Sequence, residues 1–221
     1  MLLTALVLAT TSHAADPAAL AAGLQDASGW SEIGKDDAEG VGEIVIRHKS
    51  VAGVDCLEGV GHTDVPVPVL LEAALDIPGN MRWSSAAIKE SEFLSTGAAG
   101  FDYYQYLANP FPIKDRFWFN QGTIVGDSAT GPVQFRWQHI DPNTYPERYA
   151  KVKADHDGAV ITAVNVGAWI FNPVDGGTEV RFQTCTDAGG SIPAWAGELA
   201  AKTTLPTNIA DLVREGKRRS Q

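Results

Sequence analysis

The chain has 221 residues, of which 44% are hydrophobic and 20% are charged, so a disordered or collagen-like protein is excluded. The 17 Lys and Arg residues against 27 Asp and Glu residues give a formal net charge of −10. This balance argues against nucleic acid as a partner and against broad adhesion to anionic membranes, because both select for basic surfaces. No segment approaches the roughly 20 apolar residues that a membrane-spanning helix needs.

The first 14 residues contain no Asp, Glu, Lys or Arg. Residues 2–9 form a short apolar run, and Ser12, His13 and Ala14 resemble the small-x-small pattern of a cleavage site. We therefore predict a secretory signal peptide at residues 1–14, a mature domain at residues 15–221, and a periplasmic or secreted protein. The alternative is an ordinary N-terminal helix.

The elements of the first third mix helix and strand signals. A short helix is expected from Asp16 to about residue 27, followed by a polar, glycine-containing loop at residues 31–42. Strands are expected at residues 43–50 and 54–61. A second helix is then expected from an N-cap at Thr63 and Asp64 to about residue 76.

The middle of the chain is dominated by strand patterns. Val133, Phe135 and Trp137 alternate with polar residues, as in a half-buried antiparallel strand. Residues 141–158 contain three turn signals and are expected to be a loop. The predicted strands are residues 86–94, 101–108, 117–126, 132–140, 159–171 and 178–186.

The end of the chain has helical spacing, with Ser191 as a candidate N-cap and Pro206 as a predicted kink or interruption. Strands that follow one another without alternating helices disfavour a parallel, doubly wound fold. We predict an α+β fold in which one curved antiparallel sheet wraps around a long C-terminal helix. Incomplete contact between the sheet and that helix would leave an apolar pocket for a small ligand.

Three segments carry a family resemblance. Residues 109–119 (NPFPIKDRFWF) are similar to the P-x-P-x-x-x-R-[D]-aromatic signature of START domains, the steroidogenic acute regulatory protein-related lipid transfer domains. Residues 167–180 (GAWIFNPVDGGTEV) resemble the late strand pair of that family, and residues 186–195 (TDAGGSIPAW) resemble its entry into the C-terminal helix. The resemblance covers about residues 28–216.

The resemblance implies a helix-grip fold with a hydrophobic tunnel, which binds and transfers a lipid or another hydrophobic small molecule. It implies no cofactor, and we expect a monomer that touches membranes at most transiently. The two cysteines, Cys56 and Cys185, suit either one disulfide or two buried thiols when the residues are considered alone. The resemblance places them on neighbouring antiparallel strands and therefore favours the disulfide.

The chain departs from the family pattern at polar positions. Phe117 replaces the usual Asp after the signature Arg, and Gly122 and Thr162 fall near positions where members carry a basic residue. These differences remove candidate polar anchors. We therefore expect a more apolar ligand than a typical sterol or phospholipid, or one that is anchored differently.

The candidate tunnel residues combine aromatic side chains with a few polar groups. Alternation places Tyr104 and Tyr106 on one face of their strand and Tyr103 on the other, and the sequence does not say which face is inward. Arg116 could contact the ligand or form a structural ion pair with Asp115 or Asp187. The predicted ligand-binding residues are Tyr104, Tyr106, Arg116, Trp118, Asn120, Trp169, Trp195 and Leu199.

No catalytic or metal-binding motif is recognised in the sequence. The cluster at residues 155–157, Asp-His-Asp, lies beside a glycine and is typical of a solvated loop. We therefore favour a carrier that performs no chemistry. The alternatives are an enzyme of the cyclase or dehydratase type in the same kind of pocket, which needs a facing acid and base, and an interaction module with a filled interior.

Overall fold

The computed structural model describes residues 16–187 and 194–221, with the side chains of residues 194–202 left outside the description. The predicted signal peptide and the predicted N-cap at Ser191 therefore lie outside the described residues. The elements are α1 (Pro17–Gln25), β1 (Ser31–Ala38), β2 (Gly42–Val51), β3 (Val54–Thr63), α2 (Val67–Leu75), α3 (Asn80–Trp83), β4 (Ile88–Gly97), β5 (Gly100–Leu107), β6 (Arg116–Gly126), β7 (Val133–His139), η1 (Pro142–Thr144), α4 (Pro146–Asp155), β8 (Val160–Ile161), β9 (Val164–Val174), β10 (Gly177–Asp187) and α5 (Ala194–Arg219).

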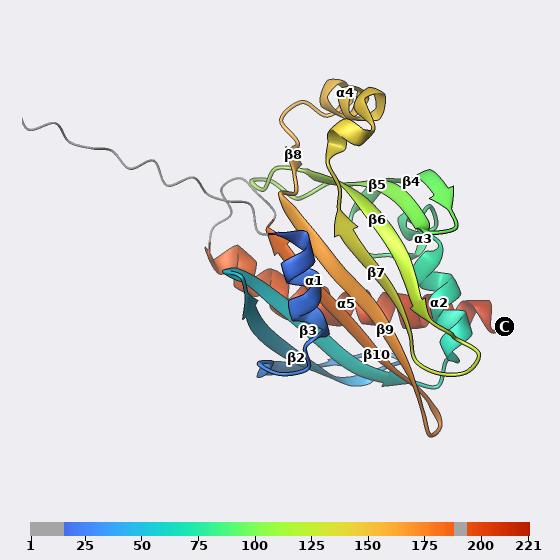
Figure 1. The fold of residues 1–221 in the computed structure, drawn as a ribbon. Coiled ribbons are helices and arrows are strands. Elements are labelled where there is room, and N and C mark those ends of the chain that lie inside the picture. Colours follow the sequence, from blue (N-terminus) through green and yellow to red (C-terminus); the bar gives the residue numbers. More distant parts are fainter. Residues whose placement is uncertain (1–15, 188–193) are drawn as a thin grey trace, which may run out of the picture.

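The described strands form one ten-stranded sheet in the order β1-β2-β3-β10-β9-β7-β6-β5-β4, with β8 added in parallel to β6. All the other strand pairs are antiparallel. The sheet curves around α5, as Figure 1 shows. This arrangement confirms the predicted α+β, helix-grip fold. Within the described residues, no helix has the length and apolar character required to cross a membrane.

The sheet has two differently covered faces. The inner face packs against α2 and α5, in a core that joins Leu70, Ile209 and Leu212 to Phe135 and Phe171. The outer face carries α1 over the middle of the sheet and α4 at one end (Figure 1). Because successive side chains of a strand point to opposite faces, a strand such as β5 can supply both cores: Tyr103 packs in the inner one and Tyr104 in an outer one.

The predicted disulfide is confirmed. Cys56 of β3 and Cys185 of β10 lie directly opposite each other in the antiparallel register, with their Cα atoms 4.2 Å apart. The bond lies on the outer face beneath α1, where Leu20 and Leu24 pack against it. The disulfide thus joins β3 to β10, two neighbouring strands whose cysteines are 129 positions apart in the sequence.

Two predicted loops are wrong. Residues 31–38 form the edge strand β1. Its side chains are mostly exposed and several are charged, so the sequence shows no alternating apolar pattern. Charged side chains are common on edge strands, where they disfavour pairing with another molecule. Residues 146–155, within the predicted 141–158 loop, form α4. The Pro146 turn signal is in fact the first residue of that helix, and only Val152 is fully buried.

Two helix boundaries also differ from the predictions. The N-cap of α2 is Pro66 rather than Thr63 or Asp64, because Thr63 still belongs to β3. The C-terminal helix α5 continues without interruption past Pro206, which it contains in its interior. Packing of Leu205, Ile209 and Leu212, all buried, against the sheet offsets the backbone hydrogen bond that this proline cannot donate.

Candidate ligand cavity

A cavity of about 300 Å³ lies between the inner face of the sheet and the helices α2, α3 and α5. This volume is at the lower end of the range for small-molecule sites. The lining residues are Ala74, Ile77, Asn80, Trp83, Ser84, Ala86, Ile88, Tyr103, Gln105, Leu107, Trp118, Asn120, Phe135, Trp137, Thr162, Asn165, Trp169, Phe182, Thr184, Thr186, Thr204 and Asn208.

The cavity wall is uncharged. None of its lining residues, all taken from the described part of the chain, is Asp, Glu, Lys, Arg or His. The polar groups are amides, hydroxyls and indole N–H groups, and four of the seven aromatic residues are tryptophans. An ionised group inside this cavity would therefore lose its hydration without gaining a counter-charge, which is strongly unfavourable.

Asn120 is the most deeply buried polar residue of the wall, with none of its surface exposed. Its Nδ2 donates to the hydroxyl oxygen of Tyr103 over 3.1 Å, whereas its Oδ1 accepts no hydrogen bond from the described residues. Burial raises the pKa of Tyr103, so this phenol stays neutral. Asn120 thus presents a free acceptor in an apolar surrounding, where a buried acceptor without a partner costs about 1–3 kcal/mol.

The neighbouring polar side chains satisfy one another. Trp118 Nε1 donates to Gln105 Oε1 over 3.0 Å, and Gln105 Nε2 donates to Ser91 Oγ over 2.9 Å. Ser91 in turn donates to the backbone oxygen of Ile77. This series of hydrogen bonds fixes the indole of Trp118 in the wall and links β5 and β6 to the segment after α2. The amide of Gln105 is therefore not available to anchor a ligand.

Trp137 owes its position in the wall to a glycine on the next strand. Gly167 lies opposite Trp137 in the β7–β9 register, and a Cβ atom at this position would lie 2.2 Å from the Cζ2 atom of the indole. The indole Nε1 donates to Asn165 Oδ1 over 3.0 Å. The ring therefore lies across the glycine backbone, and any side chain at residue 167 would displace it.

Three of the predicted ligand-binding residues lie together in the cavity wall: Trp118, Asn120 and Trp169. Trp195 and Leu199 belong to α5, and their side chains are outside the described part of the structure. The remaining three, Tyr104, Tyr106 and Arg116, lie elsewhere.

Tyr104 and Tyr106 point to the outer face, so their assignment to the tunnel was wrong. They pack with Phe119 and Val152 in the core under α4, because on β5 it is Tyr103 and Gln105 that face inward. The guanidinium of Arg148 on α4 lies over the ring of Tyr104, 4.1 Å from its centroid. Tyr106 donates to Asp115 and stacks on His156 at 3.8 Å between ring centroids. Burial, together with the Asp115 carboxylate, raises the pKa of Tyr106 to about 12.

Arg116 is buried outside the cavity, which corrects its assignment as a ligand contact. It stands at the start of β6, and its Nη1 donates to the backbone oxygen of Lys114. Burial lowers the pKa of the guanidinium, and the nearby Asp115 opposes that effect. The contact with Lys114 is structural, and the ion pair with Asp115 or Asp187 stays a prediction.

Other residues of the wall were not predicted as ligand contacts from the sequence, although Trp83 falls where the START family places a Trp after its early helix. Trp83 lies in the short α3, and its buried Nε1 has no hydrogen-bond partner among the described residues. Thr204 and Asn208 are one helical turn apart on α5. A Trp in a four-residue helix and two polar residues on a long helix become cavity residues only through packing.

The described residues contain no cluster of three or more His, Cys, Asp or Glu that could hold a metal ion. No protein-family model matches the chain. An uncharacterized protein of Pseudomonas aeruginosa is 30% identical over 138 residues, and the match spans 61% of this chain and 63% of that relative.

Solved structures identify the fold. A STAR-related lipid transfer protein from Xanthomonas axonopodis is 24% identical, with 87% of this chain and 99% of that chain covered and a TM-score of 0.64. Human StAR-related lipid transfer protein 5 is 13% identical, with 93% and 98% covered and a TM-score of 0.73. An aromatase/cyclase from a Streptomyces species is 15% identical, with 75% and 95% covered and a TM-score of 0.51. The chain therefore has the helix-grip fold of the StAR-related lipid transfer domains.

Proposed function

We propose that the protein binds one neutral, hydrophobic molecule that carries a hydroxyl group, in the cavity between the sheet and α5. The observation that supports this most directly is an uncharged cavity wall that contains one deeply buried, unpaired acceptor, Asn120 Oδ1. The similarity of the fold to lipid transfer proteins supports the same class of ligand.

The charge of the wall selects against ionised lipids. A carboxylate or phosphate inside the cavity would be desolvated with no basic side chain among the described lining residues to pair with, whereas a neutral aliphatic or polycyclic body gains from burial. The volume of about 300 Å³ also suits a compact molecule rather than a two-chain phospholipid.

The hydroxyl of the ligand is assigned to Asn120. A ligand O–H that donates to Asn120 Oδ1 supplies the hydrogen bond that the protein leaves unmade. Because Tyr103 holds the other end of the amide, the acceptor is oriented before the ligand arrives, and little side-chain entropy is lost on binding.

Carriage is favoured over catalysis in this cavity. An aromatase/cyclase shares the fold, and such chemistry needs an acid and a base that face each other. Among the described residues of the wall, Tyr103 is the only titratable side chain, and burial raises its pKa further from neutrality. A hydrophobic carrier needs neither group.

We further propose that this carrier is a periplasmic or secreted monomer that transfers its ligand during transient contact with membranes. The Cys56–Cys185 disulfide supports an oxidising compartment. The uncharged, apolar N-terminal residues 1–14 support cleavage of a signal peptide before folding of residues 15–221.

The test is to express the full chain with its own N-terminus in a bacterial host, purify the exported protein, and measure bound molecules by native mass spectrometry. Extraction and analysis of the bound fraction should show a neutral lipid with a hydroxyl group in a 1:1 complex. Thr184→Trp places an indole in the cavity and should abolish this complex. Thr123→Trp is the matched control, because Thr123 is also a half-buried strand threonine but lies on the outer face.

A second pair of variants tests the assigned hydroxyl. Asn120→Leu leaves the buried Tyr103 hydroxyl without its donor, so it should lower both stability and affinity, the stability by about 1–2 kcal/mol. Tyr103→Phe/Asn120→Leu removes both partners and should recover most of the stability but not the affinity. The wild type should bind a long-chain alcohol more tightly than the corresponding alkane, and the double variant should bind both equally. Equal affinity of the wild type for the two molecules would contradict the assignment of the ligand hydroxyl to Asn120. Recovery of only ionised lipids from the wild type would contradict the proposed function itself.

A further inference from the structure

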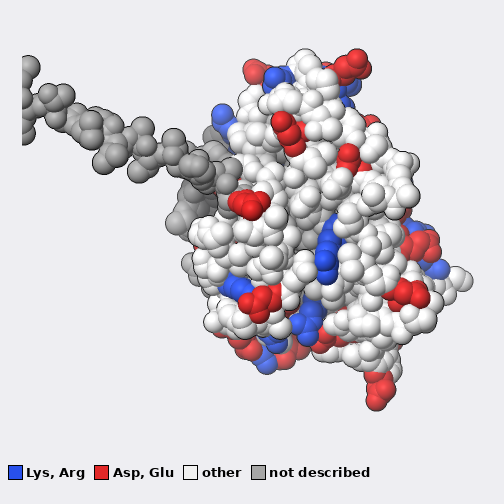
Figure 2. Space-filling model, viewed as in Figure 1, with Lys and Arg blue, Asp and Glu red and all other residues white. Residues whose placement is uncertain are grey.

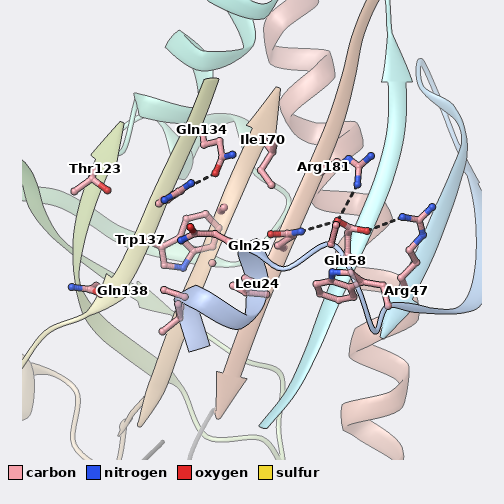
Figure 3. Close-up of a pocket in the computed structure, with 18 of the residues that line it drawn as sticks. Leu24, Gln25, Arg47, Glu58, Thr123, Gln134, Trp137, Gln138, Ile170 and Arg181 are labelled. Carbon is pink, nitrogen blue, oxygen red and sulfur yellow. Dashed lines mark hydrogen bonds and ion pairs between the residues drawn. The ribbon is translucent and has the colours of Figure 1, made fainter. Parts of the chain in front are cut away.

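A second hollow, of about 540 Å³, lies on the outer face of the sheet beside α1 (Figure 3). It is lined by side chains of β2, β3, β6, β7, β9 and β10, with Leu24 and Gln25 of α1 at its edge. In Figure 2, Lys and Arg atoms lie in a recess near the middle of this face, within a largely uncharged surface. The hollow lies on the opposite face of the sheet from the inner cavity, although Trp137 lines both, and the described linings differ in charge.

The register explains how the hollow forms. Six residues follow one another across six neighbouring strands at the same level of the sheet, from β6 to β2: Thr123, Arg136, Ala168, Gln183, Glu58 and Arg47. Ala168, in the middle of this row, is the small residue that leaves a depression between Arg136 and Gln183. Because adjacent strands are about 4.8 Å apart, those two side chains start roughly 10 Å from each other.

On one side of the depression, the charges neutralise each other. Glu58 is fully buried, accepts from Arg47 over 3.2 Å and from Gln183 over 2.8 Å, and lies 3.6 Å from Arg181. Figure 3 shows these interactions converging on the Glu58 carboxylate. Both arginines therefore have a structural partner.

On the other side, Arg136 has no such partner. Its Nε donates to Gln134 Oε1 over 2.7 Å, which fixes the plane of the guanidinium, and Arg136 forms no ion pair with any described residue. Thr123, Gln121 and Gln138 surround it in the register, and their side chains make no hydrogen bond within the described part of the chain. The lining contains three Arg and one Glu, in a chain of net charge −10.

We propose that this outer hollow, centred on Arg136, binds a small organic carboxylate that carries several hydroxyl groups. A guanidinium whose terminal amino groups are unpaired matches a carboxylate through two parallel hydrogen bonds. The free amides and the threonine hydroxyl around it can both donate to and accept from hydroxyl groups. Leu24 and Ile170 add a small apolar surface for the carbon skeleton.

The test is isothermal titration calorimetry of the purified, disulfide-bonded protein with gluconate, and with sorbitol as the neutral molecule of the same carbon skeleton. Gluconate should bind in a 1:1 ratio, whereas sorbitol should bind at least about tenfold more weakly. Arg136→Gln should weaken gluconate binding by about tenfold or more. Arg82→Gln removes the same charge at an exposed residue outside the hollow and should leave binding unchanged.

Thr123→Trp gives a second readout that leaves all charges in place. It should block gluconate, while Thr184→Trp in the inner cavity should not. Absence of saturable gluconate binding to the wild type, equal binding of sorbitol, tighter binding of inorganic phosphate, or unchanged binding by Arg136→Gln would each overturn the proposal. None of these results depends on whether the inner cavity holds a lipid.

Discussion

The buried polar groups on the two faces of the sheet differ in charge and in hydrogen bonding. On the inner face, the polar side chains of the cavity wall that the structure describes are all neutral, and one acceptor of Asn120 has no partner among the described residues. On the outer face, Glu58 is buried just as completely, but it is ionic and receives hydrogen bonds from Arg47 and Gln183. A satisfied buried charge is structural, whereas an unsatisfied neutral group in a cavity is available to a ligand.

The largest expected effect concerns the bond that holds the outer face together. Cys56→Ser/Cys185→Ser opens a loop closed by residues 129 positions apart, so chain-entropy estimates predict a loss of about 5 kcal/mol in the free energy of unfolding. Urea denaturation of the oxidised wild type and the double variant measures this loss. A difference below about 1 kcal/mol would mean that the disulfide is not what fixes β3 to β10.

The next effect tests whether Glu58 is structural. Glu58→Gln keeps the shape but removes the charge that Arg47 and Arg181 share. We expect a loss of about 3 kcal/mol in the free energy of unfolding, at the low end for a broken buried pair because both arginines retain partial access to water. Binding of the neutral ligand in the inner cavity should remain unchanged. Lost ligand binding in a variant of unaltered stability would contradict the division between the faces.

The smallest effect concerns the outer-face cluster under α4. Burial by itself raises the pKa of Glu90, but hydrogen bonds from His156 and Arg148 outweigh it, so the pKa lies below its ordinary value. The folded protein therefore binds fewer protons than the unfolded chain, and the contribution of Glu90 is present above about pH 4.5 and is lost as the pH falls further. Its size should be about 1 kcal/mol or less, because the carboxylate is partly exposed.

Thermal unfolding between pH 7 and pH 3 checks this assignment. Glu90→Gln should lower the stability at pH 7 and make its decline in acid less steep than in the wild type. Glu43→Gln is a suitable control, since Glu43 pairs with Lys35 on the exposed edge of the sheet. If the thermal stability of the wild type and of Glu90→Gln falls equally steeply between pH 7 and pH 3, this carboxylate does not contribute to the pH dependence.

Much of the fold could be predicted from the sequence. The alternation around Phe135, the helical spacing of residues 205–213 and the turn signals between strands gave most of the strands and the final helix. The predictions failed where local pattern is weak. The edge strand β1 has few apolar residues, and α4 buries only Val152 completely, so neither shows a clear period.

The site was predicted less well, for a reason that Tyr103 and Tyr104 illustrate. Alternation separates these neighbours onto opposite faces, but both faces of this sheet are covered and both carry aromatic residues. Only the placement of α5 on one face and α4 on the other makes Tyr103 a cavity residue and Tyr104 a core residue. The hydrophobicity of the strand residues does not indicate which helix packs on which face of the sheet.

The sequence by itself determined the strand and helix periods, the family resemblance and the pairing of Cys56 with Cys185 that it implied, because these depend on residues within one segment or on a fixed order of segments. Only the tertiary structure decided three properties of the described residues: the inner wall is uncharged, Asn120 Oδ1 is unpaired and Arg136 has no carboxylate partner. Those properties are set by distances between side chains from several strands, and such distances exist only after the sheet has curved and its covering helices have packed.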